Sequence, residues 1–318
     1  MDENAIIEIV KNGLDVAGSS ISMLVGAVIT TLFLRKDTKT AEFEKIKAGK
    51  FDEVVDKLLE SGKMTYLEYY KCNNFLDIAK KADESLSIIH EVYEEENTRN
   101  QEYNFDWFIR FFDAASNISN EEMQKFWASI LAGEVYHSGS YSLRAIDTLY
   151  NMTPLEAELF ADISKIVMDA SILFSSMEVS GQPENKIWQN INAKYLFDND
   201  SLRILEECGI INGLLMQNKV ELEPGESLGF TCGDKILLFK PLDNQKIIIE
   251  YSCYNLTMVG TQLYPVVFQG ANDNYLTELG NEIKINFPSL AVSLHPMNSM
   301  PINLDDEISY NSEIDLLS

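Results

Sequence analysis

The sequence predicts an α+β protein with an N-terminal transmembrane helix, a central α-helical domain and a small C-terminal β-rich domain that contains a winged-helix-like element. Three observations support this fold class. Residues 16–34 carry no charge, apolar residues recur at three- and four-residue steps over much of 37–216, and apolar and polar residues alternate after residue 216. The expected parts are an N-terminal tail and transmembrane helix at 1–36, a helical connector at 37–100, an α-helical domain at 101–216, a β-rich domain at 217–304 and an acidic tail at 305–318.

The 318-residue chain is strongly acidic. It has 25 Lys and Arg against 50 Asp and Glu, so its formal net charge is 25 − 50 = −25. Such a surface repels phosphate backbones and anionic lipid headgroups at long range, which argues against duplex DNA binding and polybasic membrane docking. The four cysteines form no CxxC pair and there are three histidines, so we expect no disulfide framework, no metal site and no cofactor.

The uncharged segment at residues 16–34 has the length of a membrane span. As a helix, its nineteen residues rise about 28 Å, close to the thickness of the hydrocarbon core of a bilayer. Acidic residues precede it, and Arg35, Lys36 and Lys39 follow it, which is not the order of a secretory signal peptide. The positive-inside rule then predicts a single-pass protein of the inner membrane with most of the chain in the cytoplasm.

Small residues recur every fourth position within this segment, at Gly18, Ser22, Gly26 and Thr30. Small residues at this spacing let helix backbones approach closely in lipid, so we expect a homo-oligomer, with a tetramer as one candidate. Their hydroxyl groups can also line a narrow polar path between several copies. The alternative interpretation is a soluble helix whose small face packs against the core of the chain or against a partner subunit.

Helix boundary signals punctuate residues 37–164. Gly62 is a helix stop, and residues 104–115 form an aromatic helix. Ser119 and Glu122 have the spacing of a capping box for a helix that runs to about residue 134. A turn at Gly139 precedes a helix that starts at residue 140 or 142, and Thr153 caps a further helix with Pro154 and Glu156 in its first turn.

Strand signals dominate after residue 209. A helix at 201–208 ends at Gly209, and the β-rich runs 235–240 and 246–251 are separated by a turn. A short helix is expected from residue 256 to residue 263, and further strands are expected at 265–268, 283–287 and 290–294. The tail from residue 305 has five acidic residues and no basic ones, which indicates a flexible segment or an interaction arm.

Acid–base and nucleophile candidates cluster around His137. Glu134 lies three residues before it, and Ser138, Ser140 and Ser142 follow it. A serine nucleophile needs a positioned base or a strained elbow, and the chain has no GxSxG motif. We therefore expect these residues to be structural, and we expect that the protein is not an enzyme.

Arg144 is a lone cation near the start of a helix. One interpretation is a salt bridge to Glu134 or Asp147, and the other is a contact to an anion that is assisted by the helix N-terminus.

Basic and aromatic residues interleave in the β-rich region, at Lys235, Lys240, Lys246, Tyr251 and Tyr254. Together they can form a surface on which nucleotide bases stack, whereas the alternative is that the aromatic rings pack in the core.

Four segments carry a resemblance to a known family: residues 119–134, with the core Trp127–Glu134, and the segments 139–144, 153–160 and 256–263. Their order resembles the bacterial abortive-infection alpha-like proteins found in anti-phage defence. With the hydrophobic segment, the architecture resembles the membrane effector subunit of the Hailong defence system. The resemblance implies a homo-oligomeric channel in the lipid bilayer, held shut by a short oligodeoxyadenylate that a partner nucleotidyltransferase makes. The alternative is a soluble or peripheral sensor module that signals to a partner enzyme.

Overall fold

The computed structural model divides the chain into two compact units, residues 1–150 and 151–318, which are considered separately. The structure describes residues 59–62, 64–92, 104–170, 172–179, 191, 194–195, 198–242, 246–298 and 309–317. The segment at 16–34, with Gly18, Ser22, Gly26 and Thr30, lies outside the described residues. Among the described residues, no helix combines the length and the apolarity that a bilayer crossing needs. The described architecture is α+β, as predicted.

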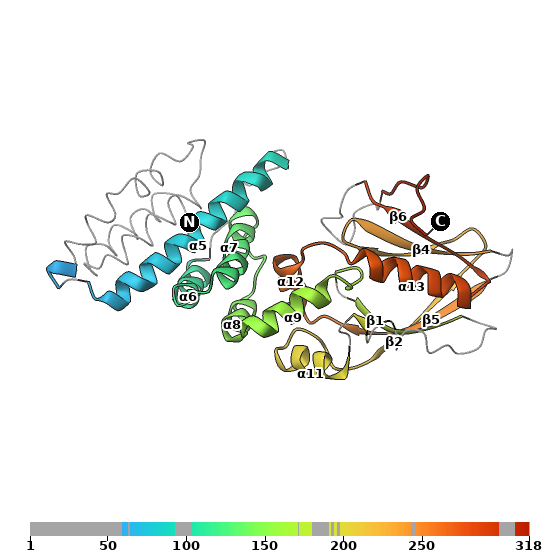
Figure 1. Ribbon diagram of the computed structural model, residues 1–318, viewed down its shortest axis with the longest axis horizontal. Coiled ribbons are helices and arrows are strands. Elements are labelled where there is room, and N and C mark those ends of the chain that lie inside the picture. The colour runs from blue at the N-terminus through green and yellow to red at the C-terminus, as the bar shows by residue number, and fades with distance from the viewer. Residues whose placement is uncertain are drawn as a thin grey trace. The chain divides into compact units, whose positions relative to one another are not determined.

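The first unit is helical in its described part (Figure 1). Its helices are α5 (Tyr66–Val92), α6 (Phe105–Ala115), α7 (Glu121–Tyr136) and α8 (Leu143–Asn151). Helices α5 and α7 pack side by side (Figure 1). Buried aromatic rings of α5, α6 and α7 contact one another. The Phe75 ring of α5 lies 4.8 Å from Phe112 of α6, and Phe111 lies 5.3 Å from Trp127 of α7. These buried rings tie the three helices together, because each removes a large apolar area from water.

The caps of the first unit were predicted well, with one exception. Gly62 adopts a φ of +67° at the turn before α5, as a helix stop requires. The predicted capping box at Ser119 is wrong by one residue, because Asn120 caps α7 and its side chain accepts the N–H of Met123 at 2.9 Å. Asparagine caps as well as serine does, and Glu122 is left to pair with Lys125.

The second unit combines four helices and six strands within its described residues (Figure 1). The helices are α9 (Pro154–Ser164), α11 (Asn199–Glu207), α12 (Met258–Val267) and α13 (Asp273–Asn286). The strands are β1 (Ile172–Val179), β2 (Met216–Leu222), β3 (Leu228–Cys232), β4 (Lys235–Pro241), β5 (Ile247–Asn255) and β6 (Leu290–Pro296). They form two antiparallel sheets with the orders β1-β5-β2 and β3-β4-β6.

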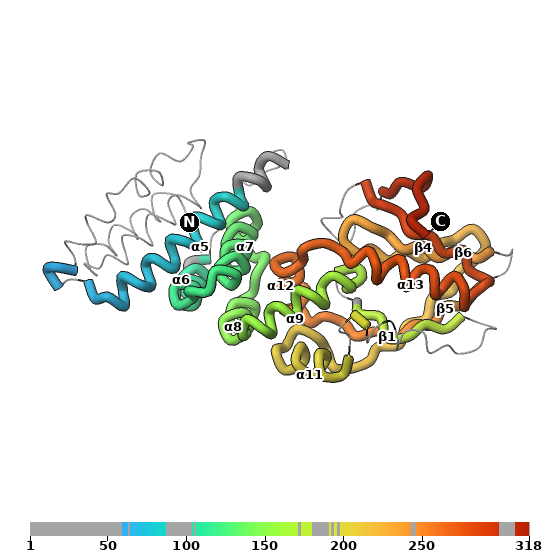
Figure 2. Tube along the Cα trace, in the orientation of Figure 1, coloured from blue at the N-terminus to red at the C-terminus, as the bar shows by residue number. Residues whose placement is uncertain are grey.

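The chain changes sheet between β4 and β5, although these strands follow one another closely in sequence (Figure 2). An aromatic cluster joins the two sheets. The Phe174 ring of β1 lies 4.7 Å from Phe230 of β3, and Tyr251 of β5 lies 5.4 Å from the same Phe230 ring. The inner faces of the two sheets therefore cover one another.

Two predicted strands are helical in the structure. The run 265–268 falls mostly in α12, which contains Pro265, and the run 283–287 forms the end of α13. A short apolar run fits a buried helix face as well as it fits a strand, so periodicity does not separate the two. The strands predicted at 235–240, 246–251 and 290–294 are confirmed, whereas β1 was not predicted.

The start of α12 lies against the end of α11. The Thr257 side chain caps α12 by accepting the N–H of Gly260 at 3.0 Å, and the Thr257 hydroxyl donates to the carbonyl of Gly209. A Cβ at Gly260 would clash with the carbonyl oxygen of Ile210. This crossing therefore requires glycine at position 260.

The tail was predicted to be a flexible segment or an interaction arm, and its described part, residues 309–317, packs on the second unit. Tyr310 forms a bridge with Met297, and the N–H of Leu316 donates to the carbonyl of Leu294 at 2.8 Å. The tail thus pairs with β6, the edge strand of its sheet.

The capping box of α9 gives a direct test of the local structure. Thr153 accepts the N–H of Glu156, and the Glu156 carboxylate accepts the N–H of Thr153. We expect Thr153→Ala to lower the free energy of unfolding of the second unit by about 1 kcal/mol, as the loss of an N-cap does. Urea denaturation followed by circular dichroism measures the change. Thr261→Ala, at an exposed position inside α12, is the control and should leave stability unchanged within about 0.5 kcal/mol.

Candidate functional site

Glu134 is a buried carboxylate that organises the turn after α7. Only 3% of the residue is exposed, and its two oxygens accept the N–H of Gly139 at 2.7 Å and the N–H of Tyr141 at 3.2 Å. Trp107 of α6 donates its indole N–H to the carbonyl of Tyr141 at 2.7 Å. A single carboxylate thus satisfies two backbone donors and fixes the loop that leads into α8.

The surroundings of Glu134 shift two pKa values. Burial raises the pKa of Glu134, and its hydrogen bonds with Gly139, Tyr141 and Ser138 oppose this shift. Burial, with a smaller effect of the Glu134 charge, raises the pKa of Tyr141 to about 12. The Tyr141 ring also fills the space beside Gly133, where a Cβ would lie 2.8 Å from the ring. Gly133 and Glu134, the last two residues of the motif Trp127–Glu134, therefore have structural roles: the first permits close packing and the second forms the turn.

Arg144 lies just beyond this turn, in the first turn of α8, and is exposed. Neither of its predicted salt-bridge partners is engaged with it. The Asp147 carboxylate pairs with Arg110 at 3.1 Å, and the Glu134 carboxylate is held by backbone N–H groups. In the described part of the chain, Arg144 makes no ion pair.

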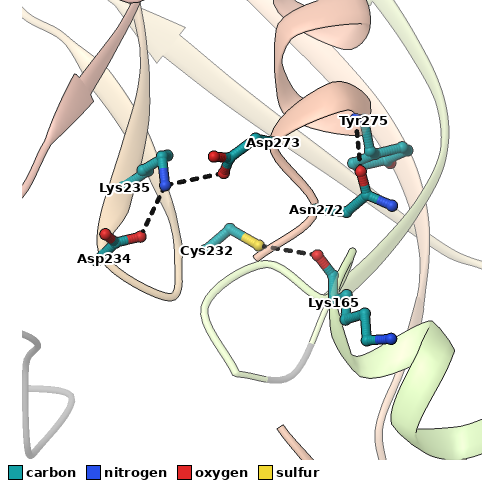
Figure 3. Close-up of polar contacts among 7 residues, drawn as sticks. All are labelled: Lys165, Cys232, Asp234, Lys235, Asn272, Asp273 and Tyr275. Carbon is teal, nitrogen blue, oxygen red and sulfur yellow. Dashed lines mark hydrogen bonds and ion pairs between the residues drawn. The ribbon is translucent and has the colours of Figure 1, made fainter. Parts of the chain in front are cut away.

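Lys235 is the most enclosed of the predicted ligand-binding lysines (Figure 3). Its side chain is 15% exposed, and its ammonium lies 2.9 Å from Asp234 and 2.8 Å from Asp273, at the start of α13. The bonds to Asp273 and Asp234 raise the pKa of Lys235, although desolvation opposes them as the largest single effect. With both carboxylates in place, the charge of this lysine is already balanced.

The other two lysines differ from one another. Lys246 pairs with Glu221 at 2.5 Å and with Glu223 at 3.1 Å, whereas Lys240 on β4 is exposed and makes no ion pair with a described residue. Lys235 and Lys240 are five residues apart on one strand, so they point to opposite faces of the sheet. The structure therefore does not bring the three lysines to one surface.

The two predicted stacking tyrosines also lie on opposite faces, because they are three residues apart on β5. Tyr251 belongs to the aromatic cluster between the sheets, 5.2 Å from the Phe174 ring, and burial raises its pKa. Tyr254 is half-buried and lies opposite Leu173 of β1. Tyr251 thus follows the packing interpretation, because its ring contacts other aromatic rings.

His137 and Ser140 do not form an activated nucleophile. The Ser140 hydroxyl donates to the carbonyl of His137 at 2.6 Å, and its oxygen lies 3.5 Å from His137 Nδ1. A base that activates a serine must accept the hydroxyl proton, and here that proton is directed to a backbone oxygen. Among the described residues, no group of three His, Cys, Asp or Glu side chains is placed to hold a metal ion.

Sequence reasoning missed a polar junction next to the sheets. The Asp169 carboxylate accepts both the N–H and the hydroxyl of Thr231, at 2.8 and 2.9 Å, and burial raises the pKa of Asp169. Asp169 and Ala170 have φ values of 48° and 52°, a conformation that aspartate tolerates and alanine rarely adopts. The thiol of Cys232, the next residue on β3, lies 3.5 Å from the carbonyl of Lys165 (Figure 3). Residues 62 positions apart make this junction, so no local pattern could have revealed it.

Glu134 offers a pH-dependent test. Its pKa is raised in the folded chain, so its contribution to stability is fully present below the pKa of the unfolded chain and is lost as pH rises through the folded value. Relative to Glu134→Gln, which does not titrate, the wild type should lose stability as pH rises above the pKa of glutamate in the unfolded chain, about 4.3. Denaturation at several pH values measures this difference.

Glu134→Ala, which leaves two N–H groups without an acceptor, should lower stability by about 1–3 kcal/mol. Glu121→Gln, at an exposed position of α7, is the control, and a loss as large as that of Glu134→Ala would contradict the assignment.

One family model matches the chain, at residues 77–280, and its description is "Protein of unknown function (DUF2806)". The match covers more than half of the 318 residues and extends from α5 into α13. No curated protein and no solved structure matches the chain. The match spans both units and contains the Glu134 turn and the Asp169–Thr231 junction. The chain therefore belongs to the DUF2806 family.

Proposed function

We propose that this chain is a membrane-embedded effector of bacterial anti-phage, abortive-infection defence, which oligomerises into a ligand-gated ion channel or pore. The observation that carries the proposal is the uncharged segment at 16–34, followed by Arg35 and Lys36. In this proposal the segment is the transmembrane helix of a single-pass inner-membrane protein, and the region at 77–280 is the cytoplasmic body that controls it.

The composition of the segment supports close helix packing in lipid. Between helices in a bilayer there is no hydrophobic driving force, so association depends on backbone approach and on hydrogen bonds between helices. Gly18 and Gly26 permit that approach, and Ser22 and Thr30 supply hydroxyl groups on the same stripe. A homo-oligomer built on this stripe would place polar groups along its axis.

In this proposal the described body binds a ligand. The Glu134 carboxylate holds a turn, and the Ser140 hydroxyl donates to a backbone carbonyl. Both groups therefore have the structural roles that were expected of them from the sequence. A body of this kind acts on the channel through the conformations that its ligand stabilises.

We propose that the controlling ligand is a nucleotide or short oligonucleotide, such as an oligodeoxyadenylate made by a partner nucleotidyltransferase. Of the predicted ligand residues, Arg144 in the first unit and Lys240 in the second unit are exposed and make no ion pair among the described residues. Each is therefore a candidate phosphate contact within its own unit. The proposed winged-helix-like element consists of a helix, a glycine turn, strands and a short helix, from α11 to α12. The net charge of −25 supports a local site for a short ligand over a duplex DNA site.

A second candidate, a soluble or peripheral sensor module that signals to a partner enzyme, is favoured by one surface feature. Leu214, Leu215 and Met216 are exposed in succession, and Met258 is 83% exposed. The N–H of Asn212 donates to the carbonyl of Asn255, which brings the two stretches close together. Exposed apolar groups that gather in this way are typical of protein-binding surfaces.

Membrane insertion separates the two candidates. We expect the chain to stay in the membrane pellet after carbonate extraction, and release into the soluble fraction would favour the sensor module. We also expect Gly26→Leu to abolish membrane depolarisation during phage challenge, because the larger side chain separates the helices. Val25→Leu, beside the small-residue stripe, is the matched control. Unchanged depolarisation by a normally expressed Gly26→Leu chain would contradict the channel.

Ligand binding is tested at the exposed cations. We expect Arg144→Gln and Lys240→Gln each to weaken oligodeoxyadenylate binding about tenfold, because each removes a charge-assisted contact. Isothermal titration of the detergent-solubilised chain measures the affinity. Arg203→Gln, which alters an exposed arginine paired with Asp200, is the control. Equal affinity in all three variants would contradict the assigned contacts.

A further inference from the structure

The C-terminal segment at 309–317 lies along the edge strand β6. We call the surface that it covers, made by β6, Gly280 of α13 and Leu237 of β4, the tail groove. Backbone hydrogen bonds run from Asn298 to Ser309, from Asn311 to Pro296 and from Leu316 to Leu294, at 2.8–2.9 Å. The segment therefore bonds to the free edge of the β3-β4-β6 sheet through its backbone, as a peptide does when it binds to an exposed edge.

A carboxylate fixes the position of the segment along the strand. Asp315 Oδ1 accepts the N–H of Leu294 at 3.1 Å and the N–H of Leu317 at 3.0 Å. The bond with Leu294 joins the segment to β6, and the bond with Leu317 closes a turn at the end of the segment. Bonds between a backbone N–H and an ionised carboxylate are stronger than neutral ones, so this contact selects aspartate.

A leucine side chain fixes the depth of the segment. Leu317 is buried and lies over Gly280 of α13, beside Leu237 of β4. A Cβ at position 280 would lie 2.6 Å from Leu317 Cδ1, which is closer than packed carbon atoms come, about 3.5–4.0 Å. The absence of a side chain at Gly280 therefore makes the space that the leucine enters.

His295 closes the outer face of the groove. Alternation along β6 directs Leu294 to the core and His295 to the opposite face, yet His295 is only 7% exposed. Its Nδ1 lies 2.6 Å from the carbonyl of Ile314, its Nε2 lies 2.8 Å from the Ser293 hydroxyl, and its ring lies 5.2 Å from Tyr310. The segment is what buries this histidine.

The segment is weakly anchored compared with the strands beneath it. Leu317 is its buried apolar residue, whereas Ile314 and Leu316 remain 45% and 39% exposed. Segments that bury little apolar surface open at a lower free energy than core strands do. Its partners lie on β6, α13 and β4, and an equivalent segment from another chain can make the same contacts.

We propose that β6 and the space over Gly280 form a peptide-binding groove for an acidic segment with aspartate two residues before leucine, and that its occupant in an assembly is the C-terminal segment of a second copy of this chain. In the isolated chain, the segment of the same molecule fills the groove. This inference does not depend on the membrane or defence proposal.

A peptide added in trans tests the groove. The full chain with Asp315→Ala and Leu317→Ala releases its own segment, and a fluorescent peptide of residues 309–318 is the probe. We expect the wild-type peptide to bind this chain at least about tenfold more tightly than the Asp315→Ala peptide does. The Glu313→Gln peptide is the matched control, because Glu313 is exposed, and it should bind like the wild type. Equal binding of all three peptides, or failure of the double variant to fold, would overturn the proposal.

A pair of full chains tests the second copy as occupant. In the Gly280→Leu chain the new side chain takes the space of Leu317, so that its segment is released but intact. We expect the Gly280→Leu chain, which donates its segment, to associate with the double variant, whose groove is empty. When Asp315→Ala is added to the donor chain, we expect the affinity of this association to fall at least about tenfold. The added substitution separates segment exchange from any other contact between the chains. An association between the chains that is equally strong with and without Asp315→Ala would contradict the second copy as occupant, even if the peptide binds.

Discussion

The packing of one three-stranded sheet on the other is the constraint on which the second unit depends. A sheet of three strands has two faces and cannot cover either by itself, so each sheet here needs the other. The rings of Phe174, Phe230 and Tyr251 make that contact. The change of sheet between β4 and β5 follows from it, because the chain must pass from one layer to the other before β5 pairs with β1 and β2. The Asp169–Thr231 junction then fixes the loop after α9 to β3, beside the same contact.

The strongly acidic composition decides which cations are available to a ligand. The chain has 50 acidic residues against 25 basic ones, so carboxylates are in excess as partners for its lysines. Lys235 and Lys246 each have two such partners. An incoming phosphate would have to compete with these carboxylates, whereas it would meet Arg144 and Lys240 without that competition. The ligand proposal accordingly rests on Arg144 in the first unit and on Lys240 in the second unit, each considered separately.

The sequence predicted local features better than distant ones, for a physical reason. The cap at Thr153 and the turns at Gly62 and Gly209 follow from the chemistry of a few neighbouring residues, and the structure shows all three. The function of Glu134 was hidden, because its two N–H donors lie five and seven residues further along the chain, across a turn. Lys235 and Lys240, like Tyr251 and Tyr254, are an odd number of residues apart on one strand, so alternation places them on opposite faces. The prediction of a single surface relied on the residue types and did not take this alternation into account. The Asp169–Thr231 junction and the contacts of the tail join residues that are far apart in sequence. Composition does not indicate which distant residues form such pairs.

Gly260 carries a consequence for tracing the ancestry of this fold. Because its backbone lies against the carbonyl of Ile210, every larger residue there would force α11 and α12 apart. When every amino acid is tried at position 260, we expect almost none of the replacements to give a folded chain. The exposed neighbour Met258 should accept many replacements. A remote homologue that retains the crossing would thus be recognisable by this single invariant glycine, even after the rest of the surrounding sequence had diverged beyond detection.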